Sequence, residues 1–218
     1  MAATSTAEPY VPDTDRLSEL SRAAAGCQGC ELYQNATQTV FGAGVAGAAL
    51  MLVGEQPGDL EDKHGEPFVG PAGKLLDRAL EQAGIDAGQV FKTNAVKHFR
   101  WRPDERSKRR IHQKPSAGNV RACRPWLAAE LRAVQPELVV ALGATAAKAL
   151  FGPSFRVTRS RGELLPWPAS AQRPQDFPIG ESRALATIHP SAVLRADDRD
   201  AAYRGLVDDL KVAATALA

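Results

Sequence analysis

The chain has 218 residues, a mass of 23.3 kDa and 44% hydrophobic residues, which is enough for one compact domain with a sizeable core. Its formal net charge of +2 excludes a nucleic-acid surface built on overall charge, so any such surface has to be a local patch. Three cysteines, no secretory signal and no apolar run of roughly 18 residues argue against a disulfide scaffold and a membrane span. We therefore expect a cytoplasmic protein, with a monomer as the simplest state.

Hydrophobic periodicity predicts a flexible tail at residues 1–13, followed by alternating helices and strands over residues 14–218. The expected elements are, in chain order, helix Thr14–Ala25, strand Ala48–Val53, helix Gly73–Ala83, strand Val90–Val96, helix Asn119–Val134, strand Leu138–Leu142, helix Ala144–Leu150, strand Ala184–Ile188 and helix Ala201–Ala214. This alternation predicts a single α/β domain with a central, mainly parallel four-stranded sheet flanked by helices on both faces.

Polar segments follow three of the four predicted strands. They are GEQPGD at 54–59, the end of TNAVKH at 94–98, and HPS at 189–191. Ligands of parallel sheets bind beyond the carboxyl ends of the strands, so these segments are expected to meet at one edge. The alternative is that their glycines and prolines only form turns. The polar side chains expected on this rim are Glu55, Gln56, Asp59, Asn94 and His189.

A basic loop is expected at about residues 99–118. Between residues 97 and 114 there are eight Lys or Arg residues and only two acids, and the run KRRIH at 108–112 ends in a histidine. Basic side chains attract a phosphate backbone, and a neutral imidazole is a good nucleophile at physiological pH. The pattern favours His112 presented to nucleic acid. The alternative is a solvated basic loop in which the histidine has no role.

The cysteines suggest a metal centre. Cys27 and Cys30 form a CxxC pair, and Cys123 lies far along the chain. Three soft ligands need a fourth to complete a tetrahedral site or to hold a cubane cluster, and His98, at the end of a predicted strand, is the best candidate. Spacing alone leaves zinc, an iron–sulfur cluster, a redox pair and three unmetallated cysteines open.

Four motifs together carry a family resemblance: GEQPGDLED (54–62), PFVGPAGKLLD (67–77), TNAVKH (93–98) and HPSAVLR (189–195). In this order they resemble the iron–sulfur uracil-DNA glycosylases of family 4, over nearly the whole chain. The resemblance implies a uracil-DNA glycosylase-like fold and excision of uracil during DNA repair. It also implies a [4Fe–4S] cluster held by Cys27, Cys30, Cys123 and His98, with the histidine at a position where the family usually has cysteine.

Two departures from the family pattern look like the UdgX subgroup. The segment between His98 and Cys123 is enlarged and contains KRRIH, and Gln56 stands where family members usually have a small residue. Members of that subgroup excise uracil and then stay covalently attached to the DNA through a loop histidine. The resemblance therefore implies single-turnover chemistry in which His112 forms a stable adduct with C1′ of the abasic site.

The resemblance also implies roles in base recognition. Phe68 would stack on the flipped uracil, and Asn94 would read its O4 and N3 edge, which penalises cytosine. His189 would donate to uracil O2, where negative charge develops as the base departs. Ser191 would contact a phosphate. The ordinary alternatives are a core phenylalanine, a turn-forming asparagine and a buried histidine that holds a turn.

The remaining candidate residues surround the expected nucleophile. Glu55 would hydrogen-bond the second ring nitrogen of His112 and stabilise the alkylated ring, while Gln56 would hold the loop near the pocket. Asp59 would position water or stabilise the sugar cation. The DNA backbone would be bound by three consecutive basic residues, Lys108, Arg109 and Arg110. Single-stranded DNA containing uracil is the expected partner, because no base pair has to be broken.

Two other interpretations remain open. One is a conventional family 4 glycosylase that turns over many times, in which His112 belongs only to a DNA-binding loop. The other is a non-enzymatic iron–sulfur module that binds nucleic acid. The second would explain the cysteines and the basic patch, but it would leave Phe68, Asn94 and His189 at one sheet edge without a purpose.

Overall fold

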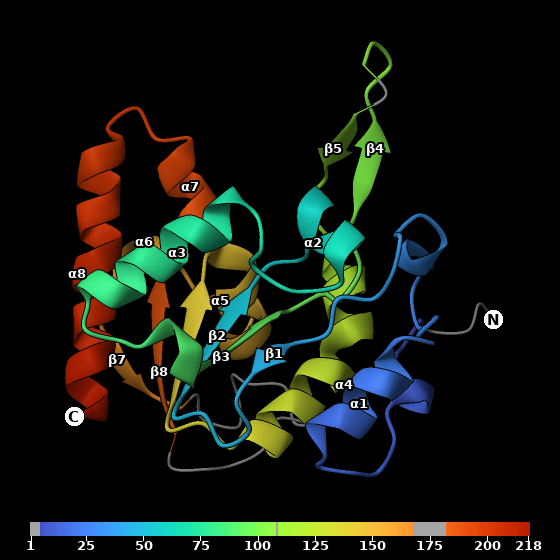
Figure 1. The fold of residues 1–218 in the computed structure, drawn as a ribbon, viewed down its shortest axis with the longest axis horizontal. Coiled ribbons are helices and arrows are strands. Elements are labelled where there is room, and N and C mark those ends of the chain that lie inside the picture. The colour runs from blue at the N-terminus through green and yellow to red at the C-terminus, as the bar shows by residue number, and fades with distance from the viewer. Residues whose placement is uncertain (1–4, 108, 168–181) are drawn as a thin grey trace.

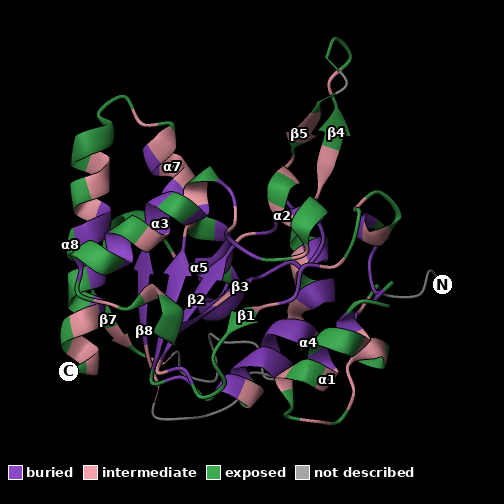
Figure 2. Cartoon of the chain, in the orientation of Figure 1, coloured by how far each residue is buried: buried purple, intermediate pink, exposed green. Residues whose placement is uncertain are grey.

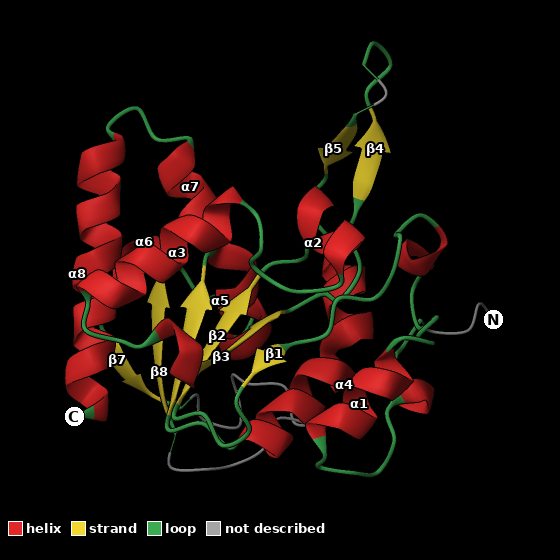
Figure 3. Ribbon diagram, viewed as in Figure 1, coloured by secondary structure: helices red, strands yellow, loops and turns green. Residues whose placement is uncertain are grey.

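The structure, a computed structural model, describes residues 5–107, 109–167 and 182–218. Its centre is a six-stranded sheet in the order β1-β3-β2-β6-β8-β7 (Figures 1 and 3). The strands are β1 (Ala43–Gly44), β2 (Leu50–Gly54), β3 (Val90–Asn94), β6 (Leu138–Leu142), β7 (Leu164–Pro166) and β8 (Arg183–Thr187). The four inner strands run parallel, which confirms the predicted α/β fold class. The short edge strands β1 and β7 pair antiparallel and were not predicted.

Helices cover both faces of the sheet (Figure 1). On one face lie α3, α7 and α8, and on the other lie α4 and α5. The helices are α1 (Leu17–Ala24), α2 (Asp59–His64), α3 (Pro71–Gln82), α4 (Ala117–Val134), α5 (Ala144–Phe151), α6 (Val157–Ser160), α7 (Pro190–Leu194) and α8 (Arg199–Leu217), with short 3₁₀ turns at Glu8–Tyr10, Glu31–Gln34 and Ala87–Gln89. No helix in the described part of the chain is long and apolar enough to cross a bilayer.

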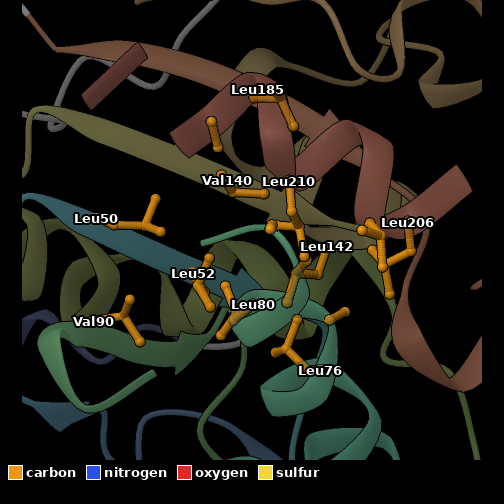
Figure 4. Packing of buried hydrophobic residues seen from close by; sticks show 14 of the residues in the cluster. Leu50, Leu52, Leu76, Leu80, Val90, Val140, Leu142, Leu185, Leu206 and Leu210 are labelled. Carbon is orange, nitrogen blue, oxygen red and sulfur yellow. The ribbon is translucent and has the colours of Figure 1, made fainter. Parts of the chain in front are cut away.

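The inner strands are buried on both sides because their residues alternate between two cores (Figure 2). Leu50 and Leu52 of β2 belong to the core that contains α3 and α8. In Figure 4, Leu80 of α3 lies near Leu52, and Leu210 of α8 lies near Val140 of β6. Met51, between the two leucines, faces the opposite core with α4 and α5. Each inner strand therefore needs a continuous run of apolar residues. For β6, the predicted first and last residues, Leu138 and Leu142, are both confirmed.

A third core lies where α1 crosses α4, and it contains the three cysteines. Part of the segment expected to be a flexible tail belongs to this core. Ala7 is 1% exposed, and its amide donates to the carbonyl of Ala122 at 2.7 Å. The prediction of a tail at residues 1–13 is thus wrong for the residues from Ala7 onward, because the chain finds backbone partners on α4; residues 1–4 lie outside the described ranges.

The segment expected to be a basic loop folds into a β-hairpin that projects from the body of the molecule (Figure 1). Its strands are β4 (Trp101–Pro103) and β5 (Arg110–His112), and Trp101 pairs with His112. The residues at the tip of the hairpin are polar. Apolar periodicity could not predict this element, because neither strand is buried.

Candidate functional site

A cavity of about 610 Å³ lies at the edge of the sheet where the parallel strands end. Its wall comes from segments that are far apart in the sequence. Among the lining residues are seven of those predicted from sequence: Glu55, Gln56, Phe68, Asn94, His112, His189 and Ser191. Asp59, Arg109 and Arg110 are not among the residues that line it, and Lys108 lies outside the described residues.

Phe68 and Asn94 shape one part of the cavity wall. Phe68 is 8% exposed and adopts a positive φ of 61°, a costly conformation for a side chain of this size. This turn requires glycine at position 73, because a Cβ there would lie 1.6 Å from the carbonyl oxygen of Phe68. A Cβ at Gly54 would lie 2.3 Å from Asn94 Oδ1. Both glycines are therefore needed for the ring and the amide to occupy these positions.

His189 faces the Phe68 ring with its own ring nearly parallel, at a centroid distance of 6.4 Å and an interplanar angle of 25°. Its Nδ1 accepts the backbone N–H of Ser191 at 3.1 Å and lies 2.8 Å from the Ser191 hydroxyl. Burial lowers the pKa of His189 to about 4, and Arg195 and His112 add to the effect. The ring is neutral at pH 7, and its proton is on Nε2, because Nδ1 is an acceptor.

Gln56 holds the root of the hairpin beside the cavity. Its Oε1 accepts the amide of Arg100 at 3.2 Å, and its Nε2 donates to the carbonyls of Arg100 and Gln113 at 3.2 and 3.1 Å. The same Nε2 lies 3.0 Å from Nε2 of His112. Because an amide nitrogen is only a donor, this contact leaves Nε2 of His112 as an acceptor with a lone pair and places the ring proton on Nδ1.

His112 is held between Gln56, Phe99 and Glu55. Its ring tilts against Phe99 at a centroid distance of 5.9 Å, and its Nε2 lies 3.7 Å from Oε1 of Glu55. We expected Glu55 to bond the second ring nitrogen, but the carboxylate faces the same nitrogen as Gln56 and is beyond hydrogen-bond distance. Desolvation lowers the pKa of His112, although Glu55 opposes the shift, so the ring is neutral at pH 7.

Arg110 anchors the hairpin instead of facing DNA. Its Nε donates to Asp59 at 2.5 Å, and its Nη1 donates to Asp62 at 2.6 Å. The guanidinium also lies over the rings of Phe99 and Trp101. The geometry does not support the predicted phosphate contact of Arg110 or the predicted catalytic role of Asp59, because the two side chains are paired with each other outside the cavity. Arg109, by contrast, is exposed.

Sequence reasoning missed several residues that line the cavity. Thr145, at the start of α5, donates its hydroxyl to Oε2 of Glu55. Arg195 is exposed at the cavity and its charge acts on both histidines, while Lys114 lies beyond the hairpin. Glu61 accepts the amide of Gly70 at 2.8 Å and so supports the start of α3. Arg195 ends the HPSAVLR motif, Glu61 lies in GEQPGDLED and Lys114 ends the basic run, so Thr145 alone among the four carried no signal in the motifs.

Comparison of the sequence with known proteins identifies the family of this chain. The family model of the uracil DNA glycosylase superfamily matches residues 41–211. The chain belongs to this superfamily. It is 35% identical to a type-4 uracil-DNA glycosylase of Sulfurisphaera tokodaii over 83% of this chain and 76% of the relative. Relatives with the same description from Thermotoga maritima and Pyrobaculum aerophilum are also 35% identical, over 78% and 84% of this chain and 78% and 85% of their own lengths.

In this superfamily member the three cysteines are buried, free and gathered in the core between α1 and α4. Cys123 Sγ accepts the amide of Lys97 at 3.2 Å, and Cys27 Sγ accepts the indole N–H of Trp126 at 3.2 Å. Burial raises the pKa of Cys123 to about 12 and also raises that of Cys30. The burial of both members of the CxxC pair argues against the redox-pair alternative, because reactive cysteines are at least partly exposed.

His98 lies next to this cysteine core, because the amide of the preceding residue, Lys97, donates to Sγ of Cys123. Its Nε2 is 2.9 Å from the hydroxyl of Thr39, and its Nδ1 is buried with no hydrogen-bond partner. Buried polar atoms are normally hydrogen-bonded, so this nitrogen has room for a partner such as water or a metal ion. Within the described ranges, however, no group of three or more His, Cys, Asp or Glu side chains could hold a metal ion. The predicted set of Cys27, Cys30, Cys123 and His98 thus offers suitable donors without converging on a single ion.

The low pKa of His189 predicts a pH-dependent stability. Between pH 6.5 and about 4 the unfolded chain binds a proton that the folded chain does not, so the contribution is complete above pH 6.5 and is lost as the pH falls toward 4. We expect wild type to lose up to about 3 kcal/mol of unfolding free energy in this window relative to His189→Gln. Urea unfolding at several pH values measures this. His64→Gln, at an exposed histidine, is the control and should follow wild type; parallel curves for H189Q and wild type would contradict the assignment.

Proposed function

We propose that this protein excises uracil from DNA as a glycosylase of the conventional, multiple-turnover type. The observation that carries the proposal is the cavity in which Phe68, Asn94 and His189 face one space. An aromatic ring, an amide and a neutral imidazole donor are what a flipped uracil needs on its face, its edge and its O2. The relatives named type-4 uracil-DNA glycosylase support this function.

Base selection rests on Asn94. Asn94 is 3% exposed, and its amide oxygen lies so close to Gly54 that a Cβ there would be 2.3 Å away. The amide N–H would donate to uracil O4 and the amide oxygen would accept N3–H. Cytosine presents an amino group and an unprotonated N3 at these positions, so both contacts would fail.

Bond cleavage would leave the electron pair of the C1′–N1 bond on uracil. The Nε2–H of His189 would stabilise the charge at O2, and the departing base would take a proton from solvent. The sugar cation would gain an oxygen from water, which releases a proton. Glu55 borders the cavity with its side chain 22% exposed, and this carboxylate would stabilise the cation and orient the water.

DNA would approach across the basic residues around the cavity mouth. Arg195 and Lys114 are exposed and line the cavity, and Arg109 lies in the exposed part of the hairpin. With Ser191 they are suited to phosphate contacts on both sides of a flipped nucleotide, which fix position and carry no sequence information. We propose single-stranded DNA as the preferred substrate and a cytoplasmic monomer as the working form. The free cysteines support the cytoplasmic location, because the cytosol is reducing.

We propose a [4Fe–4S] cluster held by Cys27, Cys30, Cys123 and His98. The donor set, the unpartnered Nδ1 of His98 and the amide donor to Cys123 support it. Each iron of such a cluster takes one protein ligand, so the four ligands need not converge on one point. When bound, the cluster would supply the cross-link between the segment before β1 and α4, and no step of the excision runs through it.

A second candidate function is the capture of the abasic site by His112. The observation that favours it is the position of His112, whose unprotonated Nε2 faces Gln56 and Glu55 at the cavity. Attack of this lone pair on C1′ would form a C–N bond and leave an imidazolium, with its positive charge beside the Glu55 carboxylate. The similarity to type-4 enzymes fits release of the product better than capture.

The main proposal is tested by uracil release. Wild type should release free uracil from a single-stranded oligonucleotide over many turnovers and should leave a cytosine control intact. Asn94→Ala should lower the excision rate by about 100-fold or more, because the base loses its edge contacts. Asn35→Ala, at an exposed asparagine, should match wild type. A protein that releases no uracil, or an N94A variant as active as wild type, would contradict the proposal.

The cluster is tested by metal analysis of protein purified without oxygen. Iron and acid-labile sulfide should be present together, with broad absorbance near ~400 nm that is typical of thiolate-bound iron. Cys123→Ala should lose the iron. Stoichiometric zinc without iron, or iron retained in C123A, would overturn the assignment.

Capture is tested on a denaturing gel. If His112 reacts, wild type and a uracil oligonucleotide should give a heat-stable, slowly migrating band whose amount is limited by the amount of protein. His112→Ala should then give free DNA with an abasic site, because water replaces the ring as nucleophile. Absence of the band together with accumulating uracil would exclude capture, and a band that persists in H112A would exclude His112 as the attachment point.

A further inference from the structure

The carboxylate of Glu55 has different neighbours at its two oxygens. Oε2 accepts the hydroxyl of Thr145, and Oε1 points toward Nε2 of His112 at 3.7 Å. Thr145 is 7% exposed and lines the cavity. One oxygen is thus used to fix the side chain, while the other remains directed at the space where the sugar would lie.

We propose that Thr145 is a positioning residue for uracil excision, which acts by holding Glu55 with Oε1 directed at the reacting C1′. The inference rests on the proposed function, since it assigns the support for a group used in that reaction. It holds whether water or His112 captures the sugar cation, because both need a negative charge at the same place.

The start of α5 makes Thr145 a rigid support. Thr145 is the second residue of α5, and the helix is preceded by Gly143, which has a φ of +87°. The amide of Gly143 donates to the carbonyl of Thr187 at the end of β8, at 2.9 Å. A Cβ at position 143 would lie 2.9 Å from Cβ of His189, so this turn is also packed against the base site. Glu55 is therefore tied through Thr145 to the same frame that holds His189.

A hydrogen bond to an ionised carboxylate is stronger than one between neutral groups, and it also selects one rotamer. Without it, Glu55 would be free to turn toward solvent, since its side chain is 22% exposed. Thr145 has no place in base recognition, because its hydroxyl is used on Glu55 and the uracil contacts come from other elements. Its loss should therefore slow the chemical step and leave DNA binding nearly unchanged.

The test compares Thr145→Val with Thr145→Ser in single-turnover excision of uracil. T145V keeps the volume and removes the hydroxyl, so the rate should fall about 10–100-fold, while the Kd for uracil DNA changes less than about 3-fold. T145S restores the donor and should stay within about 3-fold of wild type. Thr14→Val is the matched control, because Thr14 also donates its hydroxyl to a carboxylate, that of Glu19 on α1, and neither residue lines the cavity. Its rate should equal that of wild type even if its Tm falls.

A double-mutant cycle separates positioning from a general loss of structure. In a Glu55→Gln background, adding T145V should change the excision rate less than about 3-fold, because the group that Thr145 positions is already altered. Thr145→Ala repeats the comparison with T145S if valine is not tolerated. The inference is overturned if T145V or T145A matches wild type, if T145S is as slow as T145V, or if T145V costs as much in E55Q as in wild type. A wild-type protein that releases no uracil would overturn the proposed function, and this inference with it.

Discussion

The parallel register of the inner strands is the constraint on which the site depends. Gly54 at the end of β2 pairs with Asn94 at the end of β3, and Leu142 of β6 pairs with Thr187 of β8. All four strands therefore end at one level. The amide of Ala95 then donates to the carbonyl of Gly54 at 2.9 Å, which continues the pairing past the sheet. A slip of one residue would turn Asn94 to the opposite face and would expose every alternating core residue.

Behind this edge, a buried ion pair fixes the turn that carries Asn94. Lys97 is fully buried, and its Nζ donates to Thr93 Oγ1, to the carbonyl of Asn94 and to Glu130 Oε2, each at 2.7 Å. All three donors of the ammonium group are used, and Glu130 also accepts the amide of Gly42. A buried ion pair whose hydrogen bonds are all made adds little net stability compared with apolar residues in the same place. It does restrict how the chain around Asn94 can fold, because any other arrangement would leave the charge of Lys97 unpaired. The backbone of Asn94 is thus linked to α4, which also carries Cys123.

The inner sheet and the convergence of polar residues at its edge were predictable from sequence because single residue types carry the signal. Continuous apolar runs predict buried strands, and the polar residues directly after them, such as Asn94 and His189, are brought together by topology alone. The role of Arg110 was not predictable in this way. A basic residue in a basic run is expected to face solvent, and nothing local shows that Asp59 and Asp62, three residues apart on α2, neutralise it. Thr145 was missed for a similar reason, because threonine near the start of a helix is ordinary, and its partner lies 90 residues earlier.

The anchoring of the hairpin bears on the choice between water and His112. Gln56 makes four contacts at the hairpin root, three to the backbone and one to the imidazole, yet its amide has only two hydrogens to donate. Its two hydrogens are therefore shared among three acceptors, and the contact with His112, at 3.0 Å, is no longer than those with the two carbonyls. Arg110 meanwhile holds β5 to α2 and keeps the ring near the cavity. A hydrogen bond donated by Gln56 to Nε2 of His112 would occupy the lone pair that an attack on C1′ needs. While that bond is made, water would be the nucleophile that captures the cation, as the proposed multiple-turnover reaction requires.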